Sequence, residues 1–308
     1  MKRFCFFLTH PCNLLIGILE KVGWWIPDRM YLRIYYLLHN KQWLHLNPPR
    51  TFNEKIQWLK LYDRKPLYTN LVDKSTVKRY VADVIGEEYI IPTLGVWDNI
   101  EDIPFVGLPS KFVLKTTHDG GGGGVFICDK SNLDIEKIKR KIYKSFSHNI
   151  YETLREWPYK DVKPRIMAEE FLDQKKGSGK ELIDYKFFCF NGMPRFCQVK
   201  THEDERDCTD LFDMQWQLLP FNGINPTQTN ASKAPLKPQN YDEMISLAKE
   251  LSKVASFCRV DFYNIEGKVY FGELTFYPAS GMGCFTPAEY DNYVGEMLNL
   301  KCYGYEQT

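Results

Sequence analysis

The spacing of apolar residues changes along the chain, from a helical period in its first quarter to short strand-like runs after it. Residues 1–46 are apolar with a helical pattern, and two further helices are predicted downstream. The first begins at Thr51 or Asn53, because either side chain suits a helix N-cap. The second begins at Asp73, and Gly86 is expected to end it.

Beyond residue 89, the apolar runs are short and are bounded by turn residues, which predicts strands. The clearest turn is Asn191-Gly192, which is expected to join strands at 183–190 and 195–199 into a hairpin. Residues 201–240 are polar and contain four prolines, so they are predicted to be irregular. The other predicted elements are a strand at 165–172, helices at 133–147 and 241–256, and strands at 257–263 and 268–275. The pattern as a whole predicts an α+β protein.

A glycine-rich segment interrupts the most unusual of these hairpins. Phe112-Val113-Leu114 leads into Lys115, and Gly120 to Gly124 precede the next apolar run, Val125 to Cys128. Five glycines have a large entropic cost of ordering. Such a segment is expected either in a floppy surface hairpin without a ligand or where bare backbone must approach an anion such as phosphate. It is not a P-loop, because the lysine precedes the glycines.

The last predicted hairpin carries charged residues on apolar strands. Strand alternation places Arg259 beside Asp261 on one face, and Glu273 beside Thr275 on one face. If the two acids lie opposite each other, the pairing is centred on Gly267, which requires a connection of three or five residues. Two readings stay open. The acids share a divalent cation such as Mg²⁺, or Arg259 pairs with them on a solvated face.

The composition is that of an ordinary globular protein, with 308 residues, 44% hydrophobic and 26% charged. The net charge of +1 gives no overall field that would favour nucleic acid as a partner. Nine cysteines without a CxxC pair indicate reduced thiols in a cytoplasm, and they form no zinc signature.

The N-terminal region has two interpretations. Phe4 to Leu19 is apolar but short for a membrane span, and it lacks a clean cleavage site, so no signal peptide is expected. Met30 to Leu38 is rich in aromatic residues and leucine, and basic residues lie nearby. The region either lies on a membrane surface or forms a pair of helices buried against the core.

In their order along the chain, these features resemble the ATP-grasp superfamily, in which a lysine on a strand precedes a flexible glycine-rich loop. More narrowly, the chain resembles the TupA-like ATP-grasp group of bacterial polysaccharide gene clusters. The shared phrases are NPPRTFNEKIQWLKLYDR, LVDKSTVKRYV, IGEEYIIPTLGVWD, LPSKFVLKTTHDGGG and DYKFFCFNG. The resemblance implies two α+β lobes that grip ATP, behind a helical N-terminal extension. The implied parts are the extension 1–50, an N-terminal lobe 51–95, a small lobe 96–168 with the glycine loop, and a large lobe 169–308 with the metal site.

The resemblance also implies a role for individual residues. ATP phosphates would be held by Lys74, Lys115, His118, Gly120, Gly121 and Gly122. The adenine would lie against Glu169, Phe171 and Leu172, and the ribose against Asp184. Mg²⁺ would be held by Asp261, Glu273 and Thr275, and Arg259 and Lys115 would act on the transferred phosphoryl group. The family usually has asparagine where this chain has Thr275, and a hydroxyl is a poorer magnesium ligand than an amide oxygen.

The implied reaction is an ATP- and Mg²⁺-dependent ligation of a carboxylate to an amine through an acyl phosphate. The expected partners are ATP, a carboxylate-bearing glycan or amino acid, and an amine, in the biosynthesis of a capsular or other surface polysaccharide. The expected location is the cytoplasm or the cytoplasmic face of the membrane, alone or with a glycan assembly complex. Three alternatives remain: a kinase on the same fold, a glycosyltransferase using the acidic cluster 203–207, and a catalytically silent scaffold protein, which the threonine at position 275 would allow.

Overall fold

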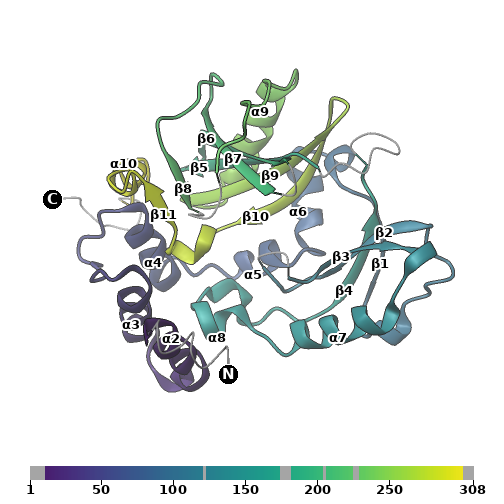
Figure 1. The fold of residues 1–308 in the computed structure, drawn as a ribbon, viewed down its shortest axis with the longest axis horizontal. Helices are drawn as coiled ribbons and strands as arrows, with labels where there is room; N and C mark the ends of the chain where they lie inside the picture. The colour runs from purple at the N-terminus through teal and green to yellow at the C-terminus, as the bar shows by residue number, and fades with distance from the viewer. Residues whose placement is uncertain (1–10, 121–122, 174–181, 204–205, 225–228, 301–308) are drawn as a thin grey trace.

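The computed structural model describes residues 11–120, 123–173, 182–203, 206–224 and 229–300. These residues form a four-stranded, a five-stranded and a two-stranded sheet and a helical N-terminal part (Figure 1). The helices are α2 (Pro11–Val22), α3 (Asp28–Asn40), α4 (Phe52–Tyr62), α5 (Leu67–Val72), α6 (Val77–Ile85), α7 (Ile135–Phe146), α8 (Ile150–Leu154), α9 (Tyr241–Ser252) and α10 (Tyr290–Glu296). No helix in these ranges is both long and apolar enough to cross a membrane.

Helix α4 begins where the sequence predicted, and Thr51 is its cap. The Thr51 hydroxyl accepts a hydrogen bond from Glu54 N at 3.2 Å, and Glu54 Oε2 accepts one from Thr51 N at 3.2 Å. This reciprocal capping box satisfies two main-chain donors of the first turn. Residues 52–60 are all buried, so α4 runs through the interior and not over the surface.

The first sheet has four antiparallel strands in the order β1 (Thr93–Trp97), β4 (Ile166–Glu170), β2 (Lys111–Thr116) and β3 (Val125–Asp129). The predicted glycine hairpin is confirmed, since β2 pairs with β3 from Lys111 opposite Asp129 to Lys115 opposite Val125. Helix α7 lies along this sheet (Figure 1). The boundaries predicted at 95/96 and 168/169 fall inside β1 and β4, which are neighbours in this sheet.

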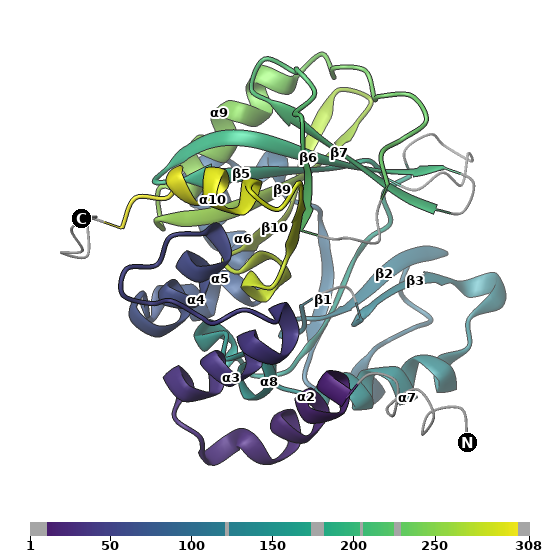
Figure 2. The same ribbon diagram turned by 60° about the vertical axis from the view of Figure 1, so that its left-hand side comes forward.

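The second sheet has five antiparallel strands in the order β10 (Lys268–Thr275), β9 (Phe257–Ile265), β5 (Asp184–Phe190), β6 (Met193–Glu203) and β7 (Arg206–Asp213). The β5–β6 hairpin turns at Asn191-Gly192 as predicted, with φ of 50° and 77°. Helix α9 covers this sheet over a core of phenylalanines, among them Phe187, Phe188, Phe190 and Phe257. Figure 2 shows this sheet above the four-stranded one.

The prediction of irregular structure for residues 201–240 is wrong in part. Strand β6 continues to Glu203, β7 follows, and β8 (Asn222–Ile224) pairs with β11 (Cys284–Thr286). Five of the eight β7 residues, 208–212, are buried, although they include a threonine and an aspartate. The polar composition concealed the strand because Thr209 and Asp210 are buried among neighbours instead of facing water.

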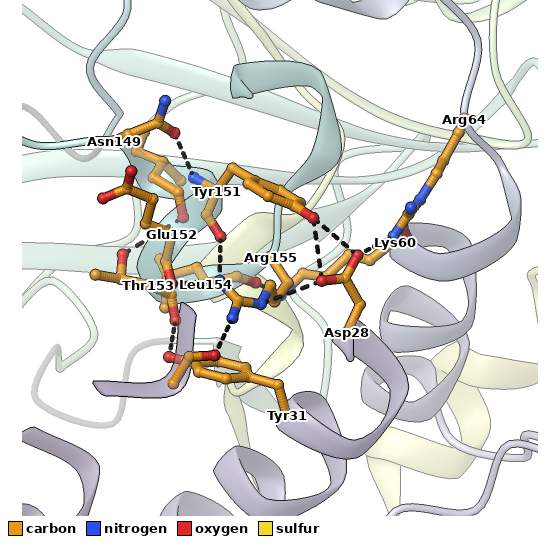
Figure 3. A network of polar contacts seen from close by, with 12 residues as sticks. Asp28, Tyr31, Lys60, Arg64, Asn149, Tyr151, Glu152, Thr153, Leu154 and Arg155 are labelled. Atoms are coloured by element: carbon orange, nitrogen blue, oxygen red, sulfur yellow. Dashed lines mark hydrogen bonds and ion pairs between the residues drawn. The ribbon is translucent and has the colours of Figure 1, made fainter. Parts of the chain in front are cut away.

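The N-terminal helices are held to the body by Arg155, which lies at the end of α8 (Figure 3). Its guanidinium stacks on the Tyr31 ring at 3.9 Å and donates to the carbonyl of Gly23 at 2.7 Å. Asp28, at the start of α3, bridges Arg155 at 3.2 Å and Arg64 at 2.6 Å. Since Arg155 is only 2% exposed, these contacts form a buried link between the two parts.

Candidate functional site

A cavity of about 710 Å³ lies between the four- and five-stranded sheets, and ten of its 24 lining residues carry charged side chains. An adjoining pocket of about 330 Å³ shares several of its walls, including Lys115, Glu169, Asp184 and Tyr263. Most of the polar residues singled out in the sequence meet in the larger cavity: Lys74, Lys115, Glu169, Asp184, Arg259, Asp261 and Glu273. These residues come from segments up to 199 positions apart, so the fold brings them together.

Glu169 and two lysines form a buried ion-pair cluster on the four-stranded sheet. Lys115 Nζ lies 2.5 Å from Glu169 Oε2, and Lys78 Nζ lies 2.6 Å from Glu169 Oε1. Burial alone would raise the pKa of Glu169, but the two ammonium groups outweigh it and hold the pKa below its ordinary value. Glu169 is therefore an anion although it is only 3% exposed. Sequence reasoning missed Lys78, which lies four residues after Lys74.

Lys74 holds the base of the glycine segment. Its main-chain N donates to Thr117 O at 3.0 Å, and its Nζ donates to the carbonyl of Asp119. Burial lowers the pKa of Lys74, while the nearby carboxylates of Glu273 and Asp119 partly offset that effect. Gly124 must be glycine, because a Cβ there would lie 1.9 Å from Thr116 Oγ1. Gly120 is described next to Asp119, whereas Gly121 and Gly122 lie outside the described residues.

His118 points away from the cavity. Its Nε2 is 3.1 Å from the carbonyl of Ser145, and its ring packs edge-on against Phe146 at 5.5 Å. The side chain is buried, and burial lowers its pKa. The structure thus places His118 against α7 instead of among the cavity-lining residues. The predicted phosphate contact would require this loop to rearrange.

Asp261 and Glu273 lie directly opposite each other on β9 and β10, the arrangement that the sequence analysis considered as a condition. The predicted connection is wrong, however. The strands turn through only two residues, Glu266 and Gly267, with φ of 51° and 84°, and a bulge at Gly272 restores the pairing of the two acids. Gly272 leaves room for the neighbouring strand, since a Cβ there would be 3.1 Å from Asp261 O.

Arg259 binds both acids, so the ion-pair reading is right about the contact. Its guanidinium donates to Asp261 at 2.7 and 2.6 Å and to Glu273 at 2.8 Å. Only part of this face is solvated. The Glu273 side chain is 41% exposed, whereas Asp261 is buried, with 2% exposed. Thr275 donates its hydroxyl to Glu273 at 3.2 Å. Burial would raise the pKa of Asp261, but Arg259 and Lys186 bring it below its ordinary value.

Lys186 is a further site residue whose place the sequence analysis did not identify. It ion-pairs with Asp184, two residues earlier on the same face of β5, and with Asp261 on the neighbouring strand at 2.7 Å. Strand alternation from Asp184 was the signal that could have found it. Asp184 Oδ1 is buried without a hydrogen-bond partner among the described residues, and burial raises the pKa of Asp184. An unpaired acceptor at the cavity wall is available to a ligand hydroxyl.

The apolar walls of the adjoining pocket come mainly from the four-stranded sheet and the residues that follow it. Phe171 and Leu172 line it directly after β4, together with Val113, Ile127 and Leu182. Glu169 and Glu170 lie at the same strand end. An apolar slot bounded by a strand end with main-chain hydrogen-bonding groups fits a flat heteroaromatic ring.

The far wall of the large cavity is a strained segment held by α4. Ala279, Met282 and Cys284 line the cavity, and Ala279, Ser280 and Gly281 have φ of 45°, 54° and 64°. Three consecutive left-handed residues are costly for an L-amino acid chain, so the surroundings must impose them.

Three polar side chains at positions i, i+4 and i+7 of α4 impose that conformation. Asn53 donates to Gly283 O at 2.7 Å, and Gln57 donates to Ser280 O at 2.8 Å and Gly281 O at 2.9 Å. Lys60 donates to Ser280 O at 2.8 Å and to its hydroxyl at 2.6 Å. We call these three residues the α4 clamp. Sequence reasoning missed the clamp, although polar residues on one stripe of a buried helix were a usable signal.

The residues present fit a nucleotide triphosphate and a magnesium ion. The cavity lysines and Arg259 supply cationic donors for phosphate, and the apolar pocket lies beside them. Asp261 and Glu273 face each other, so both carboxylates could bind the same cation. Within the described ranges no group of three or more His, Cys, Asp or Glu side chains could hold a metal. Two carboxylates suffice for Mg²⁺ when phosphate oxygens and water complete its shell.

Comparisons with known proteins agree with that chemistry. The model of a family described as TupA-like ATPgrasp matches residues 54–299. Among solved structures, D-alanine–D-alanine ligase from Helicobacter pylori is similar at 14% identity and a TM-score of 0.43, over 82% of this chain and 72% of that one. The ATP complex of the Bacillus anthracis enzyme is similar at 13% identity and 0.38, over 67% and 54%. The ligase PsnB with minimal precursor, Mg and ADP is similar at 10% identity and 0.38, over 84% and 64%. No curated protein sequence matches the chain significantly.

Proposed function

This chain belongs to the TupA-like ATP-grasp family, and on that premise we propose that it is an ATP- and Mg²⁺-dependent ligase that joins a carboxylate to an amine. The fold is the α+β ATP-grasp fold. The observation that carries the proposal is the cavity between the two sheets. There, two facing carboxylates, Asp261 and Glu273, share a wall with Arg259, Lys186 and Lys115.

The four-stranded sheet would hold the nucleotide. Lys115 and Lys74, which line the cavity, would contact phosphate oxygens, and Gly120 would offer its main-chain N–H group. The adenine would occupy the apolar pocket against Phe171 and Leu172, with Glu169 at its edge and Asp184 toward the ribose. Lys115 already has a counter-ion in Glu169, so a phosphate oxygen would take over a donor that is oriented in advance.

The five-stranded sheet would hold the reacting end. Asp261 and Glu273, with Thr275 beside them, would bind Mg²⁺, which when bound neutralises phosphate charge. A carboxylate oxygen of the substrate would attack the γ-phosphorus, and ADP would leave with the electrons of the broken P–O bond. Arg259, freed from Glu273, would steady the transferred phosphoryl group.

The second half of the reaction needs a site for the amine, and we propose that the cavity wall formed by Ala279, Met282 and Cys284 provides it. The amine would attack the acyl carbon and lose a proton, and phosphate would leave with the electrons of the acyl C–O bond. A water-excluding wall would protect the acyl phosphate from hydrolysis. The α4 clamp fixes that wall and is therefore a positioning device.

We place the reaction in the cytoplasm, with a carboxylate-bearing glycan or amino acid of polysaccharide biosynthesis as substrate. Of the acidic cluster named for the glycosyltransferase alternative, Asp204 and Glu205 lie outside the described residues. Glu203 and Asp207 lie at the end of the β6–β7 hairpin, where Asp207 pairs with Lys200 at 2.8 Å, and neither lines the large cavity.

Positional isotope exchange tests the acyl phosphate. The purified protein is incubated with Mg²⁺ and ATP that carries ¹⁸O in its β,γ-bridge, together with a panel of uronic and amino acids and no amine. A reversible phosphoryl transfer to a carboxylate moves the label to a β-nonbridging oxygen, and this exchange is the expected result. A stable phosphate ester as the product would show a kinase instead, and no exchange with any carboxylate would count against the proposal.

A further inference from the structure

The exposed apolar side chains of this protein are concentrated near its N-terminus. Of the 22 large hydrophobic residues exposed among the described positions, ten lie between residues 14 and 43. They are Leu14, Leu15, Ile18, Val22, Trp24, Trp25, Met30, Ile34, Leu37 and Trp43. A concentration of this kind marks an interaction surface, whereas scattered single residues do not.

Both N-terminal helices carry an apolar stripe that the core does not use. On α3, Tyr31, Leu32, Tyr35 and Tyr36 are buried, while Met30, Ile34 and Leu37 recur at helical spacing and are exposed. On α2, Leu19 is buried, while Leu14, Ile18 and Val22 recur every four residues and are exposed. The buried stripes account for packing, so the second stripes need another explanation.

The segment between the helices is the most exposed part of this surface. Trp24 and Trp25 lie in η1 (Gly23–Trp25), with 78% and 67% of their areas exposed. Tryptophan is enriched at membrane–water interfaces, where its ring lies at the level of the lipid headgroups. Figures 1 and 2 both show α2 and α3 at the periphery of the molecule, away from the sheets.

The charge around these stripes is positive. Lys21, Arg29 and Lys41 are exposed, and Arg33 is half-buried on α3. The two acids of the region are already engaged, since Glu20 accepts a hydrogen bond from Tyr35 and Asp28 is paired with Arg64 and Arg155. Basic residues beside an exposed apolar face complement an anionic lipid surface.

Helices α2 and α3 are also joined to the body of the protein, and α3 reaches the cavity. Arg155 and Asp28 bind them to the body (Figure 3), and His39, in the last turn of α3, lines the 710 Å³ cavity. A surface that receives α3 would therefore lie close to the cavity. That arrangement suits a substrate presented at a membrane.

We propose that the face formed by α2, η1 and α3 docks on an anionic lipid bilayer. We call it the docking face, and it comprises the ten exposed residues named above. The helices would lie in the plane of the interface, with Trp24 and Trp25 among the headgroups and the basic residues against lipid phosphates. This proposal is independent of the ligase reaction, because it rests on the exposed face alone.

Vesicle flotation tests the docking face on the purified full chain without nucleotide. Vesicles of phosphatidylcholine alone are compared with vesicles that contain one third phosphatidylglycerol. We expect binding to the anionic vesicles, at least about tenfold weaker binding to neutral ones, and a further loss in high salt. Absence of binding to anionic vesicles at low salt would overturn the proposal.

Matched variants locate the surface. Replacement of both Trp24 and Trp25 by serine is expected to weaken vesicle binding about tenfold or more, since it removes two interfacial aromatic side chains. The control replaces Val106 and Leu236 by serine, which are 95% and 83% exposed elsewhere on the molecule. Equal binding by both variants contradicts the proposal. Light scattering supplies the other readout, the oligomeric state. A wild-type protein that is dimeric and does not bind vesicles, with a monomeric tryptophan variant, would assign the face to a second copy of the chain.

Discussion

Two sets of lysines in this protein differ in what they bind. On α4, the buried Lys55 donates to the carbonyls of Gly295 and Leu298, and the buried Lys60 donates to those of Leu154 and Ser280. Around the cavity, the partly buried lysines at positions 115, 78 and 186 all bind side-chain carboxylates, and Lys78 also donates to the carbonyl of Ile91.

The difference separates a structural lysine from one that can bind a ligand. An ammonium group fixed by main-chain carbonyls holds the backbone in place, and its removal leaves those carbonyls unsatisfied. An ammonium group paired with a carboxylate beside a cavity can exchange that partner for a phosphate, at little cost to the fold. For Lys115 and Lys186, the carboxylate partner beside the cavity indicates a capacity to bind a ligand, which burial and charge alone do not. Lys74 differs from both, because it lines the cavity but donates to the carbonyl of Asp119.

The largest effect on stability is expected for Lys60→Met. It leaves two carbonyls and the Ser280 hydroxyl without their donor, and we expect the free energy of unfolding to fall by about 3 kcal/mol. Urea denaturation followed by circular dichroism measures it. Lys65→Met is the control, because this side chain is 50% exposed and lies five positions beyond Lys60. It should change stability by less than about 0.5 kcal/mol. Equal losses of stability in Lys60→Met and Lys65→Met would contradict the assignment of Lys60 as a structural lysine.

Lys115→Met is expected to show the opposite behaviour. The affinity for ATP should fall about 10- to 100-fold with the loss of a charge-assisted contact, and stability should fall by less than about 1 kcal/mol. Glu169 keeps Lys78 as its counter-ion, which limits the cost to the fold. Equilibrium dialysis and urea denaturation provide the two values. The matched control is Lys111→Met on the same strand, with a side chain 55% exposed, and ATP affinity that fell equally in both would contradict the assignment.

A third prediction extends the comparison to the carboxylates. Glu273→Gln should weaken ATP binding about tenfold when Mg²⁺ is present and leave binding in EDTA unchanged, because it removes half of the cation's carboxylate ligands. Fluorescence titration with a labelled ATP gives both constants. Glu266→Gln, exposed at the turn of the same hairpin, should match the wild type in both conditions. A loss in EDTA as large as in Mg²⁺ would show that Glu273 acts other than through the metal.

The smallest expected effect is a pH dependence that belongs to Lys60. Burial lowers the pKa of this lysine from 10.5 to about 8. Between these values the unfolded chain holds a proton that the folded chain has lost, so stability contributed by this group rises with pH. The free energy of unfolding of the wild type, minus that of Lys60→Met, should increase by about 1 kcal/mol from pH about 8 to about 9. A difference that stays constant or falls would contradict it.

Local rules predicted much of this fold from the sequence. Thr51 caps α4, Asn191-Gly192 turns the β5–β6 hairpin, and strand alternation placed Arg259 beside Asp261 on one face of β9. Each depends on residues that are neighbours in the chain or in one hairpin. The bulge at Gly272 was missed because an extra residue in a strand changes the register without changing the apolar pattern.

The rest depends on contacts between distant segments. Gln57 and Lys60 meet Ser280 across more than 200 positions, and no local pattern encodes which backbone they hold. Likewise, Lys78 and Lys186 are identified as site residues by their ion pairs with Glu169 and Asp261, and only the tertiary structure brings these carboxylates near them. The resemblance to the ATP-grasp superfamily predicted which distant residues share a site, and hydrophobic periodicity alone cannot predict this.

The central claim is that the cavity between the sheets binds ATP with a metal ion. Isothermal titration calorimetry of the wild type tests it most directly, with a non-hydrolysable ATP analogue and with a UDP-sugar, each in Mg²⁺ and in EDTA. We expect the ATP analogue to bind at least about tenfold more tightly in Mg²⁺ than in EDTA, because the cation joins phosphate to carboxylate. We expect the UDP-sugar not to compete with the ATP analogue. Binding of the UDP-sugar with no binding of the ATP analogue would contradict the account.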